Sequence, residues 1–210
     1  MGTEGDGAPA GAGTRWCGLA GMAGGALLML FSAALAARQA TDWQAGPTLG
    51  TPIHLPLMRT ITTALVLLSV GLVGLLGAQR DRLGWVTGAG GLLAMSGLAL
   101  WAYAAAGNFL PLPLPVWWHP LLFPALVALG SVVLGWGMVR SRAAPPGGAV
   151  LVGLCGPVCM ALLTSPDLAD GLLHRALSTA EYALVRTAGF VTMLLYGGGW
   201  IWLGESLWRR

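Results

Sequence analysis

Three histidines, His54, His119 and His174, carry the most specific chemistry that this sequence offers. Imidazole nitrogens bind zinc, copper and haem iron. Asp170 precedes His174 by one helical turn, so the two side chains could form a carboxylate–imidazole pair. If the fold brings these four residues to one face, they predict a metal or haem site. No ligand motif such as HExxH supports the site, and the alternative is unconnected surface histidines beside a solvated helix face.

Two cysteines, Cys155 and Cys159, are the other pair with reactive side chains. Their spacing puts both thiols on one face of a helix, but it is not the CxxC spacing of redox and metal sites. We interpret them as small apolar packing residues. The sequence also contains no phosphate loop, no dinucleotide fingerprint and no convincing Ser/His/Asp order. The sequence therefore assigns no catalytic residue and favours a non-enzymatic protein without deciding the question.

The composition places these residues in a membrane protein. The chain has 210 residues, of which 56% are hydrophobic and 9% are charged, whereas soluble domains carry about 25% charged residues. All eleven basic residues are arginines, which with abundant Ala and Gly suggests a GC-rich bacterial genome. The arginines are scattered at the ends of apolar segments and form no stripe, which argues against nucleic-acid binding.

Six apolar stretches are long enough, or nearly so, to cross a bilayer core, which takes about 17–25 residues. None contains Asp, Glu, Lys or Arg, and they cover residues 16–37, 61–78, 83–106, 116–139, 147–164 and 187–203. We predict an all-α bundle of six transmembrane helices over residues 16–210, after a disordered tail over residues 1–15. The first stretch is open to a second interpretation, because "SAALAA" near its end resembles a signal-peptidase site.

A further helix is expected between the last two stretches. Over residues 167–182, Asp167, Asp170, His174, Ser178 and Glu181 recur every three or four positions, and leucines occupy the other faces. This pattern is typical of an amphipathic helix lying on the membrane surface.

The arginines also predict the orientation of the helices. With six crossings, seven of the eleven fall on one side, and that side should be cytoplasmic. The sequence thus predicts a bacterial cytoplasmic-membrane protein with both termini in the cytoplasm. The three histidines then lie on the outer side.

Internal similarity and glycine placement indicate how the helices are organised. "AGGALLML", "AGGLLAMS" and "PGGAVLVG" start at Ala23, Ala89 and Pro146, which favours three helical hairpins arranged as parallel repeats. Low complexity can also produce such matches. Glycines such as the Gly84/Gly88 pair let helix backbones approach closely in lipid, within the chain, in a homo-oligomer or against a partner.

Two segments resemble a known group. The ending "YGGGWIWLGESLWRR" and the run "PALVALGSVVLGWGMVRSR" are similar to uncharacterised six-helix membrane proteins of GC-rich bacteria. The resemblance covers about two of the six helices. It implies the helix count and no activity.

Three functional hypotheses follow. The first is a non-enzymatic accessory or assembly subunit of a membrane complex, because the predicted membrane interior holds no ionisable residue. The second is a carrier for a neutral or lipid-like solute, because glycines interrupt the helices. The third is an outer-face metal or haem site on His54, His119, Asp170 and His174.

Overall fold

The protein is all-helical in the part of the chain that the computed structural model describes, which is residues 12–41, 54–82, 84–111, 119–173 and 178–209. Six helices follow one another along the sequence. They are α1 (Ala12–Thr41), α2 (His54–Ala78), α3 (Trp85–Ala106), α4 (His119–Ser141), α5 (Pro146–Leu173) and α6 (Thr179–Trp208).

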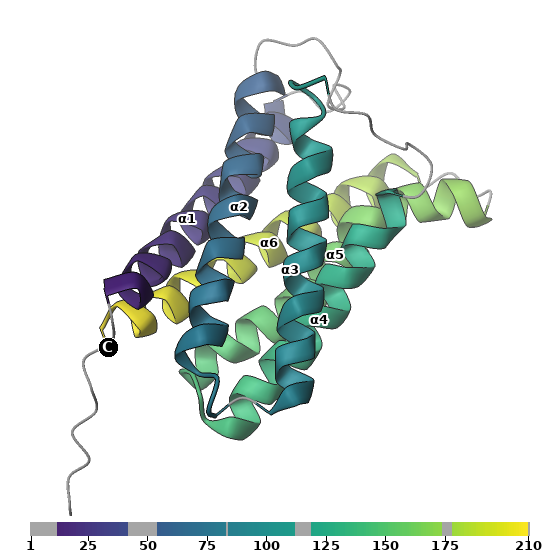
Figure 1. Cartoon of the computed structure of the whole chain (residues 1–210). Coiled ribbons are helices and arrows are strands. Elements are labelled where there is room, and N and C mark those ends of the chain that lie inside the picture. Colours follow the sequence, from purple (N-terminus) through teal and green to yellow (C-terminus); the bar gives the residue numbers. More distant parts are fainter. Residues whose placement is uncertain (1–11, 42–53, 83, 112–118, 174–177, 210) are drawn as a thin grey trace, which may run out of the picture.

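The six helices form a closed ring. Each packs against the helices before and after it, α6 closes the ring by packing on α1, and α2 also contacts α6. Figure 1 shows the beginning of α1 beside the end of α6. We call this the terminal end of the ring, and we call the opposite end, where α2, α4 and α6 begin, the distal end. The two connections within the described terminal end, after α2 and after α4, are short.

Composition explains why these segments are helices and where they can reside. Four of them, within α1 to α4, are long and apolar enough to cross a membrane, and α5 adds a shorter apolar stretch, Pro146–Leu162. In lipid a backbone must satisfy its own hydrogen bonds, and a helix does so within one segment. The chain is therefore a helical membrane protein.

Glycines determine how closely the helices of the ring approach one another. A Cβ atom added at Gly25 of α1 would lie 2.5 Å from the carbonyl oxygen of Gly197 on α6, and one added at Gly18 would lie 2.7 Å from that of Gly204. Positions rise along α1 as they fall along α6, so the two helices are antiparallel. Only residues without a side chain permit backbones to approach this closely.

Helix ends differ from the predicted apolar stretches. Among the largest differences, α2 begins at His54 rather than near residue 61, and α6 begins at Thr179 rather than near residue 187. Both helices thus extend past an arginine, Arg59 or Arg186. An apolar count finds only the part of a helix that suits hydrocarbon, whereas backbone hydrogen bonds continue into the polar flank.

The predicted surface helix over residues 167–182 is not a separate element. Instead, α5 continues without a break to Leu173, and Ser178 begins α6. Ser178 has an extended backbone (φ −62°, ψ 156°), its hydroxyl accepts from the Glu181 N–H, and the Glu181 carboxylate accepts from the Ser178 N–H. This capping box starts a new helix inside the polar stripe, which periodicity alone did not reveal.

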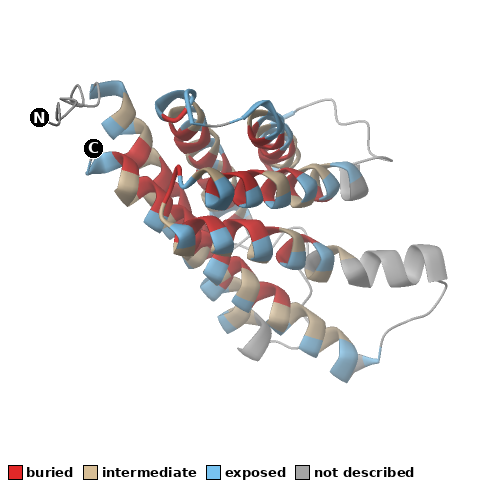
Figure 2. Ribbon diagram, turned by 90° about the horizontal axis from the view of Figure 1, so that it is seen from below, coloured by how far each residue is buried: buried red, intermediate tan, exposed pale blue. Residues whose placement is uncertain are grey.

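Burial follows the ring. Figure 2 shows buried residues on the helix faces that turn toward one another, with exposed residues on the outside. Many exposed side chains are large and apolar, among them Trp85, Trp136, Leu154 and Leu184. Such an outer surface suits lipid rather than water.

Candidate functional site

The interior of the ring is closed and apolar. Its largest fully buried side chains include Tyr196 and Trp200 of α6, Leu68 of α2, Leu98 of α3 and Leu134 of α4, all within one continuous cluster. Among the described residues, no Asp, Glu, Arg or His side chain is buried. The described interior therefore supplies no charged group for catalysis or ion transfer.

A few buried polar side chains connect helices across the ring. The Ser32 hydroxyl of α1 donates to the carbonyl oxygen of Phe190 on α6 at 2.8 Å. The hydroxyl oxygens of Ser131 on α4 and Tyr196 on α6 lie 3.3 Å apart. At the terminal end, the buried Gln79 amide has no hydrogen-bond partner among the described residues. The Ser32 and Ser131 hydroxyls thus join neighbouring parts of the interior, whereas Gln79 makes no such connection among the described residues.

Three of the four predicted metal ligands lie toward the distal end. His54 is the first residue of α2, His119 is the first residue of α4, and Asp170 lies in the last turn of α5. Within the described residues α2 packs against neither α4 nor α5. The side chains of these three residues and the whole of His174 lie outside what the structure describes. The shared metal or haem site therefore stays a prediction.

The two cysteines of α5 are free thiols. Cys159 is buried in the apolar core, and Cys155 is half-buried and packed against it. Among the described residues, no group of three His, Cys, Asp or Glu side chains could hold a metal ion. This placement agrees with the interpretation of the cysteines as packing residues.

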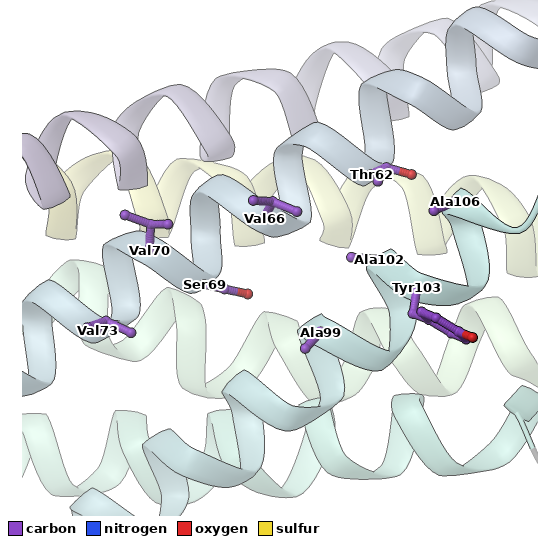
Figure 3. A pocket seen from close by; sticks show the side chains of 9 residues that line it. All are labelled: Thr62, Val66, Ser69, Val70, Val73, Ala99, Ala102, Tyr103 and Ala106. Atoms are coloured by element: carbon purple, nitrogen blue, oxygen red, sulfur yellow. The ribbon is translucent and has the colours of Figure 1, made fainter. Parts of the chain in front are cut away.

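One cavity among the described residues is a groove on the outside of the ring, between α2 and α3. Its volume is about 460 Å³, within the range of about 300–1,000 Å³ typical of small-molecule sites. Figure 3 shows the α2 and α3 side chains that form its two walls. The lining residues are Thr62, Val66, Ser69, Val70 and Val73 of α2 and Ala99, Ala102, Tyr103 and Ala106 of α3. We call this cavity the α2–α3 groove.

The chemistry of the groove is that of hydrocarbon. Its two hydroxyls on α2 are already used: Thr62 donates to the carbonyl oxygen of Met58, and Ser69 donates to that of Leu65, each at 2.8 Å. A polar ligand would thus gain little from them. The groove can hold an apolar chain through close packing and the exclusion of other lipid.

The groove exists because one wall is built from alanines. Ala99, Ala102 and Ala106 recur on one face of α3 and lie opposite the valines of α2. Sequence reasoning missed this site. The available signal was the alanine spacing in "LALWAYAAAG", but nothing in that spacing says which helix lies opposite.

A smaller cavity of about 300 Å³ lies between α4 and α5. It is lined by Pro124, Ala125, Ala128, Pro157, Met160, Ala161 and Thr164. Its lining is also mostly apolar, so it supplies a comparison for the larger groove.

Comparison of the chain with family models, with curated proteins and with solved structures gives no match. Its function must therefore be argued from its own geometry.

Proposed function

We propose that the chain is a non-enzymatic accessory or assembly subunit of a membrane complex. In this proposal its six helices cross the bacterial cytoplasmic membrane, both termini lie in the cytoplasm, and the helices form three hairpins repeated in parallel. The terminal end is then the cytoplasmic end, and the arginine distribution supports that orientation.

The observation that carries the proposal is a pair of glycines that contacts no other helix among the described residues of the ring. A Cβ atom added at Gly84 or Gly88, at the beginning of α3, would meet nothing within 4 Å. Other glycines of the ring, such as Gly25, are in tight backbone contact. A GxxxG pair is a common packing surface between helices in lipid. An unused pair therefore supports docking of a helix from a partner protein or from a second copy.

The test is to purify the full chain in a mild detergent and identify stoichiometric partners by native mass spectrometry. We expect Gly88→Leu to lower partner recovery at least tenfold, because a bulky side chain separates the two helices. Gly198→Leu is the matched control, because a Cβ atom there also meets nothing within 4 Å. Recovery of the wild-type chain as a monomer with no partner would contradict the proposal.

A second candidate, a carrier for a lipid-like solute, is favoured by the α2–α3 groove. The groove is apolar and opens on the outside of the ring. A carrier should accelerate movement of a labelled lipid-like solute between the leaflets of reconstituted vesicles. Protein-containing vesicles no faster than empty ones would eliminate this candidate.

A further inference from the structure

One end of the α2–α3 groove has a cation beside it. Arg59 precedes Thr62 by one helical turn, and Phe109 follows Ala106 by three residues. The guanidinium carbon of Arg59 lies 5.8 Å from the centre of the Phe109 ring. The pair thus joins α2 to the segment after α3, next to the distal end of the groove.

The Arg59 charge is available to a ligand. The residue is exposed, and within the described part of the chain its guanidinium contacts the Phe109 ring and no carboxylate. An aromatic ring orients a guanidinium without neutralising it. A guanidinium is also well suited to bind phosphate, because its N–H groups form paired hydrogen bonds with two oxygens.

The length of the groove matches one leaflet of a bilayer. Thr62 and Val73 are eleven residues apart, which is about 16 Å along a helix axis. Half of a bilayer's hydrocarbon core is about 15 Å. A chain that begins beside Arg59 and follows the groove would thus end close to the middle of the membrane.

The volume of the groove distinguishes a lipid chain from a helix. A cylinder about 10 Å wide and about 16 Å long would fill about 1,250 Å³, whereas the groove holds about 460 Å³. An α-helix with its side chains is about 10–12 Å wide. The groove can therefore enclose an extended hydrocarbon chain but not a whole helix.

We propose that the α2–α3 groove binds an acyl chain of an anionic phospholipid and that Arg59 binds its phosphate group. The apolar lining, the length of one leaflet and an arginine that contacts no carboxylate among the described residues together match that molecule. The inference uses the groove that favours the carrier function, and a tightly bound lipid would serve an accessory subunit equally well.

The experiment uses the full chain reconstituted in vesicles of equal parts phosphatidylglycerol and phosphatidylcholine. The protein is purified in mild detergent, and the retained lipids are counted by mass spectrometry. We expect phosphatidylglycerol to be enriched over phosphatidylcholine. Arg59→Gln should lower that ratio about fivefold, the effect typical of one arginine on an anionic lipid.

Arg186→Gln is the control for charge. Arg186 also lies over an aromatic ring, that of Tyr182 on its own helix, at 4.8 Å, but it adjoins no residue that lines the α2–α3 groove. Its substitution should leave the lipid ratio unchanged. Equal retention of the two lipids by the wild-type chain, or an equal loss in both arginine variants, would overturn the role of Arg59.

Ala99→Phe tests the groove itself. Ala99 is exposed and lines the groove, so the larger side chain should lower retention of both lipids without entering the core. Val70→Phe fills the same groove from α2, and Ala125→Phe fills the smaller α4–α5 cavity as the matched control. Unchanged lipid retention in both groove variants, or loss of a co-purifying polypeptide instead of lipid, would overturn the proposal.

Failure of this inference is distinguishable from failure of the carrier function. If lipid is retained but does not move faster between the leaflets, the lipid site is supported and the carrier function is refuted. If both Arg59→Gln and Ala99→Phe still accelerate lipid movement between the leaflets, the carrier function is supported and the lipid site is refuted.

Discussion

Single residues act in this protein mainly through their size. Gly25 and Gly197 meet backbone to backbone, whereas Gly198, the next residue, faces open space. Of two adjacent glycines in "YGGGW", one is thus in tight contact with another helix and the other is not. The difference is set by the position of α1, which is far away in the sequence, so residue type alone could not reveal it.

Gly25→Ala should destabilise the ring. The new Cβ atom would lie 2.5 Å from the carbonyl oxygen of Gly197, and because that atom belongs to the backbone, two helices must move apart. Overpacking of this kind costs about 1–3 kcal/mol. Thermal unfolding in detergent micelles measures the effect.

Gly198→Ala is the control for this substitution. The new Cβ atom meets nothing within 4 Å. The substitution should therefore be neutral or stabilise α6 by up to about 1 kcal/mol, because alanine favours helix. Equal losses of stability in the two variants would show that backbone contact does not hold α1 against α6.

At the scale of the element, helix ends determine where the chain turns. Ser178 caps the beginning of α6 with a capping box, and Arg142, the residue directly after α4, has a left-handed backbone conformation (φ 50°). Left-handed backbone costs a non-glycine residue roughly 1–2 kcal/mol. Arginine at this position is costly for folding, yet it adds to the positive charge that predicts the orientation.

Arg142→Gly should therefore raise the free energy of unfolding by about 1 kcal/mol, because glycine adopts this conformation without strain. Arg140→Gly is the matched control inside the last turn of α4. It should lower stability by about 0.5–1 kcal/mol, since glycine there weakens the helix. Denaturation of both variants in the same detergent shows whether the free energy of unfolding changes in opposite directions. A loss of stability in both variants would refute the strain argument.

At the scale of the whole molecule, the ring brings the first and last helices together. The close glycine contacts between α1 and α6, and the hydrogen bond from Ser32 to Phe190, join residues far apart in the sequence. If α1 were cleaved after "SAALAA", the ring would lose a helix that packs on both α2 and α6. This packing supports the interpretation of α1 as a retained helix.

Six crossings require both chain ends on one side of the membrane. We expect single cysteines at positions 15 and 209, in a chain whose native cysteines are replaced, to react with a membrane-impermeant maleimide only after the cytoplasmic face is opened. A cysteine at position 59 should react in intact cells. Labelling of positions 15 and 209 from opposite sides would require an odd number of crossings and would refute the proposed topology.

The sequence by itself determined the helical class, the approximate places of the apolar segments and the short connections at the terminal end. These properties are local, because hydropathy over about 20 residues decides whether a segment suits lipid. The interpretation of Cys155 and Cys159 as packing residues agrees with the burial of Cys159 in the core and the packing of Cys155 against it. Its boldest expectation, the histidine site, concerns side chains that the structure does not describe.

Only the tertiary structure decided how the helices close into a ring and where two of them leave space. The α2–α3 groove needs Ala102 and Val66 on opposite walls, and the charge of Arg59 matters because Phe109 places it next to one end of that groove. Such pairings join positions tens of residues apart. Any apolar face can pack against any other in lipid, so periodicity cannot specify the neighbour, and only the packed backbone shows where a small side chain leaves room.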